Sequence, residues 1–206
     1  MSTQPAVSRP HSRAAVVAEL IRVLSQAPVR VTNIESAIAE IGASAQEIAA
    51  HFGSNRELIL FLVSQSSDSM QAALAPASTR EQLRQRLLEF GQRVTDVYSS
   101  HLRSLYRIAV TESIRHTGLG RDFYEVGPGR LRQHLTEFLQ TAQSEGVLGS
   151  GAADLLASHF LASLRANLDI ADTFLPATNR AALAHVQQVV DLFLDGLNGG
   201  TPPCRN

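Results

Sequence analysis

Residues that could do chemistry are scattered along this sequence rather than clustered. Seven histidines are present, yet none lies in a Cys-x-x-Cys or His-Glu-x-x-His arrangement. The nearest approach to a metal site is Glu112 with His116, four residues apart and beside Arg115. A structural metal needs three or four converging ligands, whereas basic residues near a helix C-terminus are favourable without any metal. We therefore expect a helix end here and no metal.

Nucleophile motifs and glycine-rich nucleotide loops are also missing. The sequence has no G-x-S-x-G elbow, no P-loop and no Rossmann glycine pattern. The pairs Gly118-x-Gly120 and Gly127-x-Gly129 lack the preceding strand that a phosphate loop requires, so we interpret them as hinges. The sequence thus predicts no catalytic residue and no cofactor, and an enzyme is the least favoured class.

Residues 31–58, VTNIESAIAEIGASAQEIAAHFGSNREL, have the pattern of a DNA-reading motif. Four apolar residues of its first part share one helical face, namely Ile34, Ala37, Ile38 and Ile41. Gly42 interrupts this pattern and lets the chain turn. Ser44 and Glu47 then form the side-chain pair that caps a helix start. Two short helices joined by a small-residue turn predict a helix-turn-helix, whose second helix can enter the major groove of DNA.

The second helix of this motif offers few groups for reading bases. Its groove-facing positions are expected to be Ala45, Gln46, Ala49 and Ala50. Of these, Gln46 alone can form hydrogen bonds with a base edge such as that of adenine.

The same segment resembles the N-terminal signature of the tetracycline-repressor (TetR) family. The similarity rests on Thr32-Asn33-Ile34, on Ile41-Gly42-Ala43-Ser44 and on His51-Phe52-Gly53-Ser54-Asn55-Arg56-Glu57-Leu58. Residues 118–125 and 127–131 resemble the ligand domain of one branch of that family. The resemblance implies an all-α fold, with an N-terminal three-helix helix-turn-helix domain and a C-terminal helical domain for ligand binding and dimerisation. The implied function is a ligand-responsive transcriptional repressor, a homodimer that binds palindromic double-stranded operator DNA and a small-molecule effector.

The second helix departs from the family pattern. The family usually has Gly-Thr-Leu-Tyr where this chain has Gln46-Glu47-Ile48-Ala49, and a lysine where it has Asn55. In the family these positions serve backbone phosphates, which receive half or more of protein–DNA hydrogen bonds. An alternative therefore stays open, in which the chain kept the fold for protein interaction or ligand sequestration and lost DNA binding.

The candidate DNA-contacting residues come from the helix-turn-helix and from the basic arm before it. The arm arginines either reach the minor groove or a phosphate, or belong to a solvated tail. The full set is Arg9, Arg13, Thr32, Ser44, Ala45, Gln46, Glu47, Ala49, Ala50, His51 and Arg56.

Charge and composition limit the partners. The net charge is −1 with a pI near 6.7, and residues 1–56 carry five arginines and four glutamates, so 5 − 4 = +1. A strongly basic patch would support DNA binding, and its absence argues against tight non-specific binding. The single Cys204 allows no intrachain disulfide. No apolar run approaches the ~20 residues of a membrane span, and the N-terminal residues lack a signal-peptide core. A cytoplasmic protein without membrane contact is expected.

Helical periodicity continues through the rest of the chain. The predicted helices cover 12–26, 54–74, 79–99, 101–116, 131–145, 153–171 and 178–197, with a break around one short helical turn over 117–129. The predicted domains are 1–56 for DNA binding, with a flexible arm over 1–12, then 57–199 for ligand binding and dimerisation, then a disordered tail over 200–206.

Two sets of residues in the larger domain are candidates for binding. Aromatic residues with a few polar groups suit a ligand cavity between helices, although ordinary core packing is the alternative for each. The ligand candidates are Tyr106, Glu112, Phe123, Tyr124, Phe160 and Asn167. A 3-4-3-4 row of apolar residues predicts a coiled-coil-like dimer seam, with burial inside the monomer as its alternative. The seam comprises Leu183, Val186, Val190, Phe193 and Leu197, together with Leu156, Phe160 and Leu164.

Overall fold

The structure is a computed structural model that describes residues 12–26, 33–166 and 179–197. Within these ranges the chain forms helices and no strands, which confirms the all-α fold. The chain divides into two compact units, one of residues 1–64 with 100–123 and the other of residues 65–99 with 124–206. No helix in the described ranges has the length and apolar character needed to cross a bilayer.

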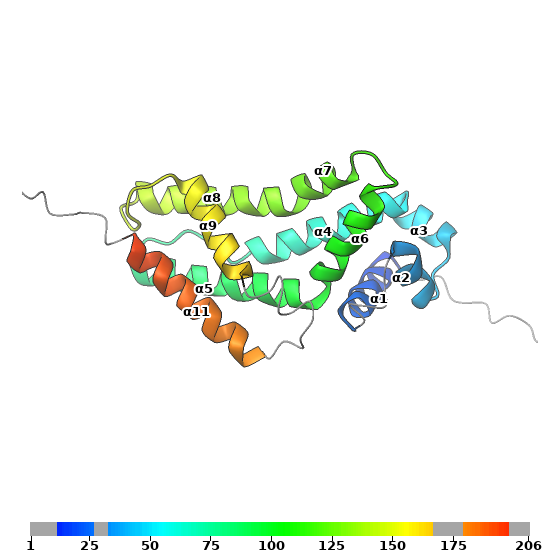
Figure 1. The fold of residues 1–206 in the computed structure, drawn as a ribbon, viewed down its shortest axis with the longest axis horizontal. Helices are drawn as coiled ribbons and strands as arrows, with labels where there is room; N and C mark the ends of the chain where they lie inside the picture. Colours follow the sequence, from blue (N-terminus) through cyan, green and yellow to red (C-terminus); the bar gives the residue numbers. More distant parts are fainter. Residues whose placement is uncertain (1–11, 27–32, 167–178, 198–206) are drawn as a thin grey trace, which may run out of the picture. The chain divides into compact units, whose positions relative to one another are not determined.

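The first unit contains the expected helix-turn-helix (Figure 1). Its elements are α1 (Arg13–Gln26), α2 (Ile34–Glu40), α3 (Ala45–Phe52), the first part of α4 (Asn55–Gln71), α6 (Arg103–Ser113) and most of α7 (Leu119–Tyr124). Its core includes Leu20 and Leu24 of α1, Ile34 of α2 and Ile48 of α3, each at most 1 % exposed. Ser104 of α6 donates a buried hydrogen bond from its Oγ to the carbonyl oxygen of Leu24, at 2.8 Å. This bond ties α6 to the end of α1.

The second unit is a helical bundle. After the last part of α4 it contains α5 (Arg80–Val97), α8 (Arg130–Ser144), α9 (Ala153–Arg165) and α11 (Asn179–Gly196). Helix α9 packs against α8, α5 and α11, and α11 packs against α5 (Figure 1). In its core the Phe160 ring centroid lies 6.3 Å from that of Phe90 and 4.9 Å from that of Phe193. Gly91 allows α5 and α11 to approach closely, because a Cβ there would lie 2.7 Å from Cγ1 of Val186.

The apolar row expected at a dimer seam lies largely inside this bundle. Four of its members have no exposed surface in the single chain, namely Phe160, Leu164, Val186 and Val190. The other members are half-buried or exposed, namely Leu156, Leu183, Phe193 and Leu197. The buried members pack within the chain, which was the alternative that the periodicity left open. Dimerisation itself stays a prediction, and a second copy could contact only residues that remain exposed.

Two π-helical turns, η1 (Tyr98–Leu102) and η2 (Glu125–Gly129), lie where the sequence suggested gaps. The predicted break over 117–129 is wrong in its second half, because residues 119–144 are helical throughout. Pro128 lacks the N–H that an α-helical turn needs, and a π turn replaces that turn with a wider one. Gly127-x-Gly129 is therefore no hinge: a Cβ on Gly129 would lie 2.9 Å from the Tyr124 carbonyl oxygen. Gly118, with φ +90°, marks the real break.

Some predictions fall on parts of the chain outside the described residues. These are the arm, the tail, and the individual residues Arg9, Thr32, Asn167 and Cys204. The domain boundary expected after residue 56 stays a prediction, and α4 continues through that position without a break.

Candidate nucleic-acid interface

Side-chain caps fix both helices of the helix-turn-helix. Asn33 begins α2 by accepting the Ser36 N–H on its Oδ1 at 2.8 Å. At the start of α3, Ser44 Oγ accepts the Glu47 N–H at 3.2 Å, and the Glu47 carboxylate accepts the Ser44 N–H at 2.8 Å. This reciprocal capping box confirms the one predicted from the sequence. Gly42 takes φ +71° in the turn between the helices, a conformation that strains other residues.

Helix α3 buries one side and exposes a face of small residues. Ile48 is 1 % exposed and anchors the helix to the core. The exposed positions of the helix are Ala45, Gln46, Ala49 and Ala50. Gln46 is the member of this face whose side chain can donate and accept hydrogen bonds. Contact of these four residues with DNA stays a prediction, in which the Gln46 amide forms the hydrogen bonds with a base.

Glu47, which departs from the family pattern, has a structural function as part of the cap of α3. Its Oε2 accepts the hydroxyl of Ser44 at 3.0 Å as well as the Ser44 N–H. The negative charge therefore sits at the N-terminus of α3, where the helix dipole favours it. The carboxylate that breaks the family pattern is part of what starts the helix.

Arg13, a candidate DNA contact, is stacked on two aromatic rings of its own unit. Its guanidinium carbon lies 4.4 Å from the Phe61 ring centroid and 5.2 Å from that of Phe52. Those two rings lie 5.5 Å apart. This cation–π arrangement attaches the start of α1 to the end of α3 and to α4.

The other arginines described between residues 12 and 64 are ion-paired. Arg22 donates from Nε to Glu19 at 2.7 Å. Arg56, another candidate DNA contact, pairs with Asp122 of α7. A cation that already has a partner must give it up before it can release counterions from a phosphate. The arginines described between residues 12 and 64 are therefore stacked on or paired with side chains of the first unit.

Asn55 and Asp122 have roles that the sequence did not reveal. Asn55 stands where the family has lysine, and it donates from Nδ2 to Glu35 of α2 at 3.0 Å. Asp122 lies 66 residues from its partner Arg56. No local spacing signals pairs this far apart, because only the fold brings them together.

The ligand candidates do not all fall in one unit. Tyr106 of α6 and Phe123 of α7 meet edge to face in the first unit, with ring centroids 5.2 Å apart. Phe160 belongs to the core of the second unit. Tyr124 is also assigned to the second unit and is 51 % exposed. The structure thus brings together one aromatic pair, and ligand binding by the set stays a prediction.

Glu112 is a buried carboxylate on α6. It is 2 % exposed, and its Oε1 has no hydrogen-bond partner in the described structure. Its Oε2 lies 3.7 Å from Nε2 of the exposed His116. In the described ranges no group of three or more His, Cys, Asp or Glu side chains is placed to hold a metal ion.

Comparisons with known proteins agree with this architecture. A family model described as the AefR-like transcriptional repressor, C-terminal domain, matches residues 85–196, more than half of the 206-residue chain. No curated protein matches the sequence.

Several solved structures share the fold. A protein from Mesorhizobium loti, described as a TetR-family transcriptional regulator, is 22% identical with a TM-score of 0.65, over 90% of this chain and 98% of its own. The TetR-family regulator PfmR from Thermus thermophilus is 18% identical with a TM-score of 0.62, over 88% and 98%. The flavonoid-responsive regulator FrrA is 23% identical with a TM-score of 0.58, over 89% and 97%.

Proposed function

Because this chain belongs to the TetR family of transcriptional regulators, we propose that it binds operator DNA through α2 and α3. The observation that supports this most directly is the capped α3 with its exposed face of three alanines and Gln46. Small side chains let the helix approach the floor of the major groove. The Gln46 amide can then bond an adenine bidentately.

The phosphate contacts must come mainly from residues other than the arginines described in the first unit. Arg13, Arg22 and Arg56 are stacked or paired within the first unit. We assign the phosphate contacts to Arg9 of the arm and to Arg30, which precedes the helix-turn-helix. This assignment predicts a small number of contacts per protomer and a modest dependence on salt.

The proposed functional form is a homodimer on a palindromic site, with half-sites roughly 34–36 Å apart. Exposed apolar residues on α9 and α11 are available to a second copy, since Leu155 is 55% and Leu192 is 75% exposed. Leu155→Glu and Leu192→Glu should give monomers that keep their helix content. Val190→Glu should unfold the second unit instead, because Val190 has no exposed surface. Sedimentation velocity with circular dichroism separates these outcomes, and unchanged dimers from both leucine variants would place the interface elsewhere.

A small-molecule effector would act through α6 and α7. Tyr106, Phe123 and Glu112 belong to these helices, and Asp122 of α7 pairs with Arg56 at the start of α4. A ligand that displaces α7 would pull on Arg56, which lies four residues after Phe52, the last residue of α3. Its effect is limited to its difference in affinity for the DNA-binding and released forms. We propose release of DNA on ligand binding, as in a cytoplasmic repressor.

The test is fluorescence anisotropy of the full chain with DNA from upstream of its own gene, repeated over a salt series. Deletion of residues 1–11 removes Arg9 and His11 from each protomer. Each lost phosphate contact lowers the salt slope by about 0.9, so a dimer that loses two contacts should lose roughly two units. Arg84→Ala is the control, because that arginine pairs with Asp191 in the second unit. An unchanged slope after the deletion would contradict the assignment to the arm.

The engaged arginines also favour a second candidate function. A chain whose first unit pairs or stacks its described arginines could use the same fold for protein interaction or ligand sequestration. Absence of binding at micromolar protein, at low salt and with intact dimers, would support this candidate over the regulator.

A further inference from the structure

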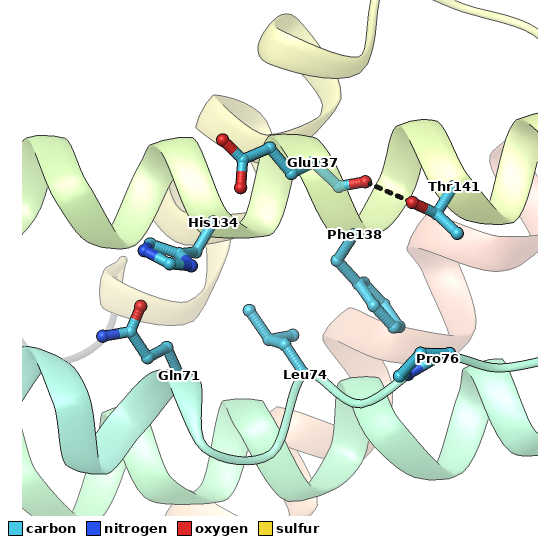
Figure 2. Close-up of a pocket in the computed structure, with 7 residues that line it drawn as sticks. All are labelled: Gln71, Leu74, Pro76, His134, Glu137, Phe138 and Thr141. Atoms are coloured by element: carbon cyan, nitrogen blue, oxygen red, sulfur yellow. Dashed lines mark hydrogen bonds between the residues drawn. The ribbon is translucent and has the colours of Figure 1, made fainter.

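We propose that the second unit contains a binding site for a compact molecule with an apolar body and an amine or alcohol head. The site is a pocket of about 210 Å³ between α8 and the segment where α4 ends (Figure 2). None of the residues that line it belongs to the ligand candidates predicted from the sequence. It goes beyond the proposed regulation of DNA binding and does not depend on it.

The polar end of the pocket is set by Gln71, the last residue of α4. Its Nε2 donates to Oδ1 of Asp68 at 2.8 Å, and the same oxygen lies 2.9 Å from the guanidinium of Arg130. A carboxylate can only accept hydrogen bonds, so the amide nitrogen must face Asp68. The amide oxygen is thereby turned to the other side, and Figure 2 shows it directed toward His134 across the pocket.

That oxygen is an acceptor without a donor. Gln71 Oε1 is buried and has no hydrogen-bond partner in the described structure. A buried carbonyl left unpaired is destabilising, and most such groups in proteins have a partner. A ligand N–H or O–H would supply it once the side chains of Gln71 and His134 move apart, because the oxygen has almost no accessible surface in this structure. Because Asp68 holds the amide in place, the acceptor is already oriented before the ligand arrives.

The opposite end of the pocket is apolar. Leu74 and Pro76 come from the segment after α4, and Phe138 comes from α8, one turn beyond His134 (Figure 2). The cavity volume of about 210 Å³ is below the roughly 300–1,000 Å³ of drug-sized sites. A single ring or a short branched chain is the body that fits.

The charges around the pocket select against an anion. No arginine lines it, and the carboxylate of Glu137, which is also among the lining residues, accepts a hydrogen bond from Gln133 Nε2 at 3.0 Å. An incoming carboxylate would meet the Gln71 oxygen without a fixed cation to offset the repulsion. An amine or an alcohol presents a donor instead. The site should therefore distinguish molecules of equal size by their head group.

Three probes of equal size test this on the full chain, namely benzyl alcohol, benzylamine and benzoate, followed by ligand-observed NMR and calorimetry. Dissociation constants near 1 mM are expected for the alcohol and the amine, the range of a weak fragment. Gln71→Met keeps the length of the side chain and removes the acceptor, and it should weaken both by about fivefold, the equivalent of one hydrogen bond. Its melting temperature should change little, since the variant removes an unpaired buried acceptor but also loses the hydrogen bond from Gln71 Nε2 to Asp68.

Two further variants keep the test decisive. Gln85→Met is the matched control, because Gln85 is an exposed helical glutamine bonded to Glu89 at 3.1 Å, outside the pocket. It should leave all three probes unaffected. His134→Phe should also weaken the donor probes, and it serves if Gln71→Met does not fold. The proposal is overturned if benzoate binds as well as the alcohol, if neither donor probe binds at about 10 mM, or if both pocket variants bind normally.

Discussion

Separating the two roles of Glu47, as helix cap and as charge near DNA, is the sharpest experiment that this structure suggests. The carboxylate accepts two hydrogen bonds from Ser44, from its N–H at 2.8 Å and from its hydroxyl at 3.0 Å. Glutamine at this position can still close a capping box, but it carries no charge. Glu47→Gln therefore keeps the cap and removes the charge, Glu47→Ala removes both, and Ser44→Ala removes the serine's half of the box.

The stability changes follow from these contacts. Losing a serine cap costs about 0.5–2 kcal/mol, and each kcal/mol lowers the melting temperature of a chain of this size by about 2–4 °C. Ser44→Ala and Glu47→Ala should therefore melt a few degrees below the parent. Glu47→Gln loses only the favourable charge at the helix N-terminus, about 0.3–1 kcal/mol. Thermal unfolding followed by circular dichroism measures all three.

Among the Glu47 variants, DNA affinity should rise most for Glu47→Gln, the variant that loses least stability. A carboxylate 4 Å from a phosphate is repelled by about 1 kcal/mol in water, so Glu47→Gln should bind DNA up to about fivefold more tightly per protomer. Glu47→Ala should gain less, because its helix start is frayed. Anisotropy at low and high salt measures the effect, which should shrink as salt rises. Weaker DNA binding by Glu47→Gln with an unchanged melting temperature would refute this reasoning. Glu47 would then be a base reader that accepts from cytosine N4.

Three other predictions follow from single sites. Ala49→Tyr should tighten DNA binding, because it adds a hydroxyl to the exposed face of α3, and a weaker complex in anisotropy would mean that the small face is required. Gly91→Ala should lower the free energy of unfolding by about 1–3 kcal/mol, because its Cβ would lie 2.7 Å from Val186, whereas Gly196→Ala, with nothing within 4 Å, should not; equal urea midpoints would contradict this. Burial lowers the pKa of His101 from its ordinary 6.5, so below that pH the unfolded chain takes up a proton that the folded chain does not, and stability falls as the solution is acidified. His101→Gln should lose less stability between pH 7 and 5 than the parent, and parallel pH profiles would show that His101 does not titrate this way.

The sequence determined the features that depend on near neighbours. The capping box of Ser44 and Glu47 spans three residues, and the turn needs one glycine at Gly42, so both could be predicted without the fold. Ser12 at the start of α1 follows the same local rule, since its Oγ accepts the Ala15 N–H. These interactions belong to a single helix start or turn, and the helix-turn-helix was predicted because it is built from them.

Periodicity determined which face of a helix is buried but not what covers it. Val186 and Val190 follow the spacing of a seam, and such a row fits a second chain or another helix of the same chain equally well. In the structure α5 and α9 supply the cover, through Gly91 and Phe160 among others. Pro128 shows the same limit, since a proline is expected to end a helix and a π turn instead carries the helix through it.

Only the tertiary structure decided which polar groups are occupied and which are left open. Arg56 and Asp122 are 66 residues apart in sequence, and Arg13 meets Phe61 through the packing of α1 on α4. In the sequence nothing distinguishes Gln71 from other helical glutamines, and only the fold buries its Oε1 beside α8. Residue type decides which hydrogen bonds a side chain can form. The fold decides which groups lie opposite it and so whether those bonds are formed. Which side chains are left available to bind DNA or a ligand could therefore not be predicted from the sequence.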